Sequence, residues 1–393
     1  LKGINMPHNH FLKPLHILAE KTFGESYATH KYCFDDNEPP DAFEAEKDFS
    51  FKDYGETIRY STPINLSQFQ KQLNSPVFSY FLDGSRRTYK IDDIRYDARI
   101  YPVLIGQIGV ACCHRASSDN FKSLRTENRL ILAIPIQANP DGGDFDSPFF
   151  DELKNNINSE SSLKRLGLKL HKIIAYPERE GLEYSNLAIA ALHEEMLDME
   201  KEFIDWLVKE KRVLTPYCRL IKDGSIEYQK STRGTYRDLS RLKSNYKCVV
   251  GVSKRFNPEK CVDRTGKSNA SLIAKLPLYH RTPVFKFISE RAGGEGGSVY
   301  IAAWYIRIRD IKHTISPFDG VVKAERILTD SKEIEEGLDS EEVDLISANL
   351  VWERNPTCYG KDFRWANHLY PIYLTELNLK SRRLSDHVLM NIL

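Results

Sequence analysis

The run from Ile100 to Cys113 limits the possible folds of this chain more than any other feature, because it is the longest stretch in which apolar residues predominate. Gly106, Gln107 and Gly109 interrupt it, so it is too short and too broken to span a bilayer. A run of this kind is typical of a buried β-strand. Hydrophobic residues form 41% of the 393 residues, enough to bury such a strand in a sizeable core.

Shorter apolar runs predict further strands around this one. Residues 77–82 form a β-rich run that ends at Asp83-Gly84-Ser85, which we interpret as a turn. Residues 130–136 form another, in which Pro135 marks an edge or an end. Downstream, strands are predicted at 219–222, 246–252, 299–308 and 319–327.

One long helix stands among these strands. Between Asn186 and Lys211, apolar residues recur at spacings of mostly three and four, which indicates one buried face. A shorter helix is predicted from Tyr373 to Arg383. Strands that alternate with helices predict an α/β fold with a mixed sheet flanked by helices. The weak periodicity of residues 1–75 predicts an irregular or partly helical N-terminal extension before a main domain at 76–393. Dimerisation or partner contact is the candidate role of this extension.

The charge balance and the cysteines limit the class of protein. Lys and Arg number 56 against 55 Asp and Glu, which excludes a uniformly basic nucleic-acid sleeve but not a local basic groove. The seven cysteines include no C-x-x-C pair, so we expect neither a zinc site nor a disulfide framework. A reducing, cytoplasmic location without membrane attachment fits best.

The tripeptide Asp-Gly-Ser occurs twice, at Asp83 and at Asp223, each time directly after a predicted strand. An Asp at the carboxyl end of a strand projects from the sheet edge, and the following Gly lets the backbone turn away. The alternative is structural, since Asp-Gly is a common turn signal. Two copies in the same context make a shared site the sharper hypothesis.

The long helix offers a third carboxylate, because Glu195, Glu200 and Glu202 all lie near its apolar stripe. Three carboxylates that meet repel one another unless a cation lies between them. Mg²⁺ and Mn²⁺ prefer such oxygen ligands, and two such ions can drive phosphodiester cleavage. The alternative is that these glutamates are solvated residues beside the stripe.

Basic residues follow two of the strands. Lys254-Arg255 comes after the strand at 246–252, and Arg86-Arg87 comes after the first aspartate. Each pair is a candidate phosphate contact, with a solvated strand end as the alternative. The position of Arg86-Arg87 beside the first Asp-Gly-Ser favours a phosphate contact.

The order of these motifs resembles that of the NurA nuclease family, over roughly Val77 to Asn378. Family members have Asp-Gly-Ser after a strand, a metal-binding Glu on a helix and a second strand that ends in Asp-Gly. For the helix position we favour Glu200, with Glu195 as the alternative. A basic residue then follows a strand, as Lys254 does, and a later strand resembles Val322-Lys323-Ala324-Glu325.

The end of the family pattern is a Tyr-Pro with a His eight positions after the Tyr. Tyr370-Pro371 fits, but Asn378 stands where the His is expected. Asn can donate a hydrogen bond but cannot act as a charged acid at neutral pH. Without a histidine at this position, general-acid assistance is not expected from it, and cleavage is expected to be weaker or differently regulated.

The resemblance implies a ribonuclease H-like core and a metal-dependent DNA nuclease. Asp83, Glu200 and Asp223 would bind Mn²⁺ or Mg²⁺, while Lys254 would contact the phosphate and Tyr370 would position the strand. It also implies a homodimer that works with a HerA-type hexameric ATPase in DNA end processing or anti-phage defence. The rival interpretations are a non-catalytic or weakly active regulator of that ATPase, and a ribonuclease on the same core.

Overall fold

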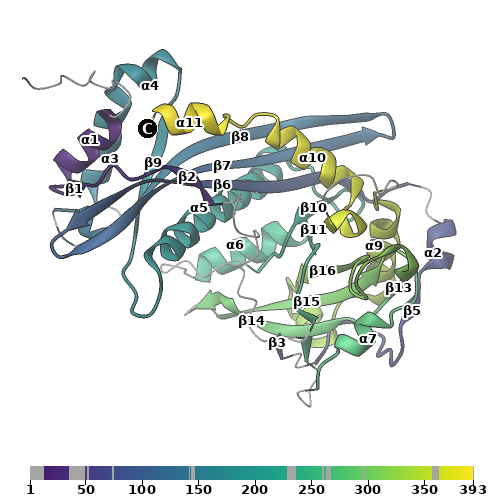
Figure 1. The fold of residues 1–393 in the computed structure, drawn as a ribbon. Helices are drawn as coiled ribbons and strands as arrows, with labels where there is room; N and C mark the ends of the chain where they lie inside the picture. Colours follow the sequence, from purple (N-terminus) through teal and green to yellow (C-terminus); the bar gives the residue numbers. More distant parts are fainter. Residues whose placement is uncertain are drawn as a thin grey trace, which may run out of the picture.

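The computed structural model describes residues 13–34, 49–50, 53–72, 75–140, 142, 147–227, 236–258, 261–262, 267–294, 297–355 and 363–392. One mixed sheet runs through the molecule in the order β4-β14-β15-β16-β11-β10-β6-β7-β8-β9 (Figure 1). Its strands are β4 (Asp53–Tyr54), β6 (Phe78–Tyr96), β7 (Arg99–Ser117), β8 (Asn120–Pro135), β9 (Leu170–Tyr176), β10 (Arg219–Asp223), β11 (Val249–Ser253), β14 (Phe285–Gly294), β15 (Gly297–Arg307) and β16 (Val321–Ile327). The predicted α/β class with a mixed sheet and flanking helices is confirmed.

The centre of the sheet combines a meander with two crossovers. Strands β6, β7 and β8 are antiparallel neighbours, whereas β10 is parallel to β6 and β11 is parallel to β10. Helix α5 (Tyr184–Trp206) connects the meander to β10 by way of β9, and helix α6 (Tyr236–Tyr246) lies between β10 and β11. The carboxyl ends of β10 and β11 therefore point the same way as β6.

The expectation that the first strand ends at Asp83 is wrong. Strand β6 is 19 residues long and stays paired with β7 as far as Tyr96. The residues after the tripeptide are rich in charge, but they alternate with buried apolar ones, among them Tyr89, Ile91 and Ile94. That alternation gives the continuing strand a core-facing side, so pairing with β7 does not stop.

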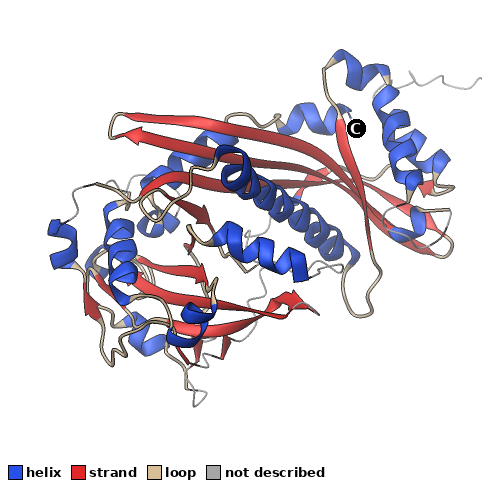
Figure 2. Cartoon of the chain, turned by 180° about the vertical axis from the view of Figure 1, so that it is seen from behind, coloured by secondary structure: helices blue, strands red, loops and turns tan. Residues whose placement is uncertain are grey.

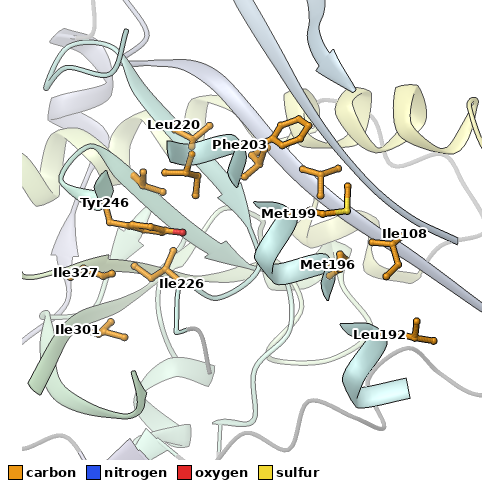
Figure 3. Close-up of a cluster of buried hydrophobic side chains, with 14 of the residues drawn as sticks. Ile108, Leu192, Met196, Met199, Phe203, Leu220, Ile226, Tyr246, Ile301 and Ile327 are labelled. Carbon is orange, nitrogen blue, oxygen red and sulfur yellow. The ribbon is translucent and has the colours of Figure 1, made fainter. Parts of the chain in front are cut away.

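Helices cover both faces of the central strands, as the two opposite views show (Figures 1 and 2). On one face the stripe of α5, including Met199 and Phe203, packs with Leu220 of β10 (Figure 3). Leu82 of β6 belongs to the same cluster. On the other face, α9 (Ser340–Trp352) and α10 (Tyr370–Lys380) contribute to a separate cluster with Phe81 and Ile221. Successive residues of β6 and β10 therefore face different helices.

The first 75 residues add short elements to this framework. Their described elements are α1 (Lys13–Lys21), β1 (Glu25–Ser26), β2 (Tyr32–Cys33), β3 (Phe49–Ser50), β4, β5 (Ile64–Asn65) and α2 (Ser67–Gln72). Strands β1 and β2 pair with β6, and β4 pairs with β14. The N-terminal segment is thus partly built into the main sheet.

The remaining elements are peripheral to the central strands. They are α3 (Pro148–Ser159), α4 (Ser161–Arg165), β12 (Cys261–Val262), α7 (Ala270–Ala274), β13 (His280–Arg281), α8 (Ser331–Glu336) and α11 (Asp386–Ile392). Within the described part of the chain, every helix is too short or too polar to cross a membrane.

Candidate active site

Asp83 and Asp223 lie next to each other on adjacent parallel strands. Lys222 is in register with Leu82, which places the following residue of each strand, an aspartate in both cases, at the next position of the ladder. Because Phe81 and Ile221 face α9 and α10, strand alternation turns both aspartates toward that same face.

Lys254 joins the two aspartates from a third strand. It follows β11 directly, and its Nζ lies 3.0 Å from Oδ2 of Asp223. Burial works to lower the pKa of Lys254, but the carboxylates of Asp223, Asp83 and Glu376 together raise it above its ordinary value. This ammonium is therefore held in its charged form by the carboxylates around it.

Among these residues, Asp83 is the one whose charge is least offset by its neighbours. Its residue is only 4% exposed, and its carboxylate has no hydrogen-bond partner among the described residues. Burial raises the pKa of Asp83 well above its ordinary value, the neighbouring Asp223 adds to the rise, and Lys254 opposes it. A buried carboxylate in this condition is unusual, since buried charge is normally paired or hydrogen-bonded.

Glu376 is a member of the group that the sequence analysis missed. It lies on α10, and its Oε2 is 3.9 Å from Nζ of Lys254. Burial would raise the pKa of Glu376, but Lys254 and Lys380 lower it below its ordinary value. With Lys380 one helical turn later, Glu376 has the sequence pattern of a solvated surface pair, so the sequence carried no signal for a role in the site.

Glu200 lies on the opposite face of the sheet. It is buried on α5, and its Oε2 is 3.0 Å from Nζ of Lys222. A Cβ atom built on Gly84 would lie 2.6 Å from Oε1 of Glu200. Because Lys222 and Gly84 alternate with Asp223 and Asp83, Glu200 contacts the face that the two aspartates turn away from.

The same α5 face carries a second charged network. Lys323 Nζ lies 2.6 Å from Oε1 of Glu325, and the hydroxyl of Ser225 donates to Oε2 of Glu325 at 2.7 Å. Lys222 in turn donates to the carbonyl oxygen of Ser225. Burial would raise the pKa of Glu325, but Lys323 and these hydrogen bonds lower it. The two motif residues of β16 thus belong to the face of Glu200.

The other candidate metal-binding and phosphate-binding residues make contacts in separate parts of the structure. Glu195 pairs with Lys172, and Arg86 donates to the carbonyl oxygen of Ile189 on α5. Arg87 forms an ion pair with Asp386 of α11, with 2.6 Å between nitrogen and oxygen. Arg255 is half-buried directly after Lys254. In this structure the candidate phosphate-binding arginines Arg86 and Arg87 are engaged within the protein.

Tyr370 and Asn378 lie on the same helix as Glu376. Tyr370 is the first residue of α10, and it is 44% exposed. The Asn378 amide donates to Oγ1 of Thr126, on β8, at 3.3 Å. Tyr370 is thus open to solvent at the start of α10, whereas Asn378 is directed to the neighbouring strands.

A metal site is not formed as such in the described residues: no three or more His, Cys, Asp or Glu side chains there are arranged to hold an ion. Instead, the ammonium of Lys254 lies among the carboxylates. No protein-family model and no curated protein matches the sequence. The NurA-like interpretation therefore stays a prediction.

Proposed function

We propose that this protein is a DNA nuclease that hydrolyses phosphodiester bonds with Mn²⁺ or Mg²⁺ held by Asp83 and Asp223. The observation that carries the proposal is the carboxylate of Asp83, which is buried beside a second carboxylate and has no hydrogen-bond partner among the described residues. Hard divalent cations bind to paired carboxylate oxygens of this kind. A bound cation would also offset the repulsion between the two aspartates.

The strand arrangement supports the same proposal. The order β8-β7-β6-β10-β11, with an antiparallel meander followed by two strands parallel to β6, is consistent with a ribonuclease H-like core. In this arrangement the two aspartates occupy the two central parallel strands, with α10 covering their face.

Each residue of the site would have its own role in phosphodiester cleavage. Asp83 and Asp223 would hold the cation, which, when bound, activates water and stabilises the leaving oxygen. Lys254 would bring positive charge to the phosphate. Tyr370, exposed at the start of α10, would position the DNA strand, and Asn378 would donate a hydrogen bond without supplying a proton.

A second function is favoured by two specific observations. Lys254 already places a positive charge beside the carboxylate of Asp223, and Asn378 stands where the NurA pattern has a histidine. A non-catalytic regulator of a HerA-type hexameric ATPase would need neither a metal nor an acid. For both functions we propose a homodimer and a role beside that ATPase in DNA end processing or anti-phage defence.

A cleavage assay separates these functions. Plasmid DNA, single-stranded DNA and RNA would be incubated with the protein and Mn²⁺, with and without a HerA-type ATPase. We expect DNA cleavage by the wild type, and a loss of at least about 100-fold in Asp83→Asn and in Asp223→Asn, because each removes a cation ligand. Asp198→Asn, a control at a carboxylate that is 61% exposed, should stay within about twofold of the wild type.

The outcomes point in different directions. Cleavage that survives both site variants contradicts the metal-site proposal. Wild-type protein that never cleaves, even with the ATPase, favours the regulator. Cleavage of RNA in preference to DNA favours the ribonuclease.

A further inference from the structure

We propose that Glu376, rather than Glu200, is the third carboxylate of the divalent-cation site, and that Lys254 occupies this site as a counter-ion that the metal displaces. This inference rests on the proposed function, since it names the remaining ligand and the resident cation of the same site. Nothing in the order of the sequence motifs points to Glu376.

The carboxylates of Glu376 and Glu200 reach opposite faces of the sheet. Asp83 and Asp223 face α10, and Glu376 extends from α10 toward Lys254. Glu200 extends from α5 and is paired with Lys222. To reach the aspartates, Glu200 would have to leave a buried ion pair and pass the backbone of β6, and breaking such a pair is strongly unfavourable.

The two carboxylate oxygens of Glu376 approach different lysines. Oε1 lies 2.6 Å from Nζ of Lys380, on the outer side of the helix, where Lys380 is 48% exposed. Oε2 is the oxygen that approaches Lys254, at 3.9 Å. One oxygen is therefore committed to a surface lysine, and the other is available to a cation in the site.

Lys254 has the charge and the position of a counter-ion to the carboxylates. Its Nζ is 3.0 Å from Oδ2 of Asp223, and its side chain is only 10% exposed. Divalent Mg²⁺ binds carboxylate oxygens at about 2.0–2.1 Å, so the ammonium cannot stay in place once the metal is bound. A divalent cation would bring about twice the positive charge of the single ammonium to the same three carboxylates. Lys254 can then move aside and still neutralise the phosphate.

Mn²⁺ binding by the intact protein tests the choice of ligand. Isothermal titration calorimetry and the electron paramagnetic resonance signal of free Mn²⁺ would be measured for the wild type, Glu376→Gln and Glu200→Gln. Glu195→Gln is the matched control on α5, at a glutamate that is paired with Lys172. We expect Glu376→Gln to weaken binding at least about tenfold, while Glu200→Gln and Glu195→Gln stay within about twofold.

Failure of the inference and failure of the proposed function are distinguishable in this experiment. If Asp83→Asn and Asp223→Asn lose Mn²⁺ but Glu376→Gln binds normally, the inference is overturned and the function stands. Weakening by Glu200→Gln alone also overturns it. If the wild type binds no Mn²⁺, both fail.

Thermal unfolding tests the counter-ion. Removal of the ammonium in Lys254→Met leaves the carboxylates without a cation, so the metal-free variant should melt below the wild type. Mn²⁺ should raise its melting temperature by more than that of the wild type, because the metal no longer competes with Lys254. Lys201→Met, a partly exposed lysine of α5, is the control. Equal shifts in Lys254→Met and the wild type would overturn the counter-ion role.

Discussion

The two Asp-Gly-Ser tripeptides have the same sequence and lie on neighbouring strands, yet they are built differently. At Asp83 the strand continues, and Gly84 stays within β6, where its missing side chain leaves room for Glu200. At Asp223 the strand ends, and Gly224 turns the backbone with a φ of +80°. The aspartates come together in both cases, but the glycines serve packing in one copy and conformation in the other.

The serines differ as well. Ser225 donates to the buried carboxylate of Glu325. The hydroxyl of Ser85 is buried in β6 without a hydrogen-bond partner among the described residues. The tripeptide therefore does not fix its own structure: alternating apolar residues downstream prolong the first strand, and a left-handed glycine stops the second.

The largest effect is expected at Gly84. In Gly84→Ala the new Cβ would press on Oε1 of Glu200 and displace the Glu200 carboxylate from Lys222. We therefore expect a loss of about 3 kcal/mol in the free energy of unfolding. Urea unfolding measures it. The double variant with Glu200→Ala should lose clearly less than the sum of the single losses. Additive losses would mean that Gly84 does not make room for Glu200.

The serine pair should give the next largest difference. Ser225→Ala removes a hydrogen bond to a buried carboxylate and should cost about 2 kcal/mol, whereas Ser85→Ala should change stability by less than about 0.5 kcal/mol. The same unfolding assay applies to both. Equal losses at the two serines would contradict the different environments of the two hydroxyls.

Substitution of Gly224 should destabilise the protein less than substitution of Gly84. A Cβ at Gly224 would meet only Nζ of Lys222, at 3.4 Å, which is an ordinary contact. The cost of Gly224→Ala is therefore conformational, about 1 kcal/mol for a left-handed residue, and Gly224→Asn should cost less. A larger loss for Asn than for Ala would argue against backbone conformation as the cause.

A further effect is a change of stability with pH in the metal-free protein. The pKa of Asp83 is raised in the fold, so the wild type loses stability relative to Asp83→Asn as pH rises from the ordinary Asp range through the raised pKa. Asp205 is the opposite control: burial would raise its pKa, but hydrogen bonds from Arg241, Lys209 and Asn245 lower it to about 2. Its contribution is complete above the ordinary Asp range and is lost only in stronger acid.

Urea unfolding between about pH 4.5 and pH 8 compares these variants. The difference between the wild type and Asp83→Asn should grow with pH, and that between the wild type and Asp205→Asn should stay flat. A flat difference for Asp83→Asn would show that its carboxyl group is not perturbed in the folded protein.

The fold was largely predictable, because the apolar stripe of α5 and the β-rich runs are local patterns. The length of β6 was not, since the charged residues after Ser85 hide an alternation that only pairing with β7 reveals. The stripe also indicated that a Glu within it needs a buried partner. Lys222 is that partner, but it lies on another strand, so no local pattern could name it.

The site was predictable only in part, for a similar reason. Strand ends suggested that Asp83 and Asp223 share an edge, and they lie on adjacent strands although only the second strand ends there. Glu376 could not be predicted, because its role depends on how α10 packs over β6 and not on its neighbours in sequence.

The most direct test is a crystal structure of the protein soaked in Mn²⁺, with anomalous diffraction data collected at the manganese edge. Our account predicts an anomalous peak in contact with the carboxylates of Asp83 and Asp223, with the amine of Lys254 moved away from Asp223. A map with no peak at these carboxylates, and with Lys254 still paired to Asp223 at saturating Mn²⁺, would contradict it.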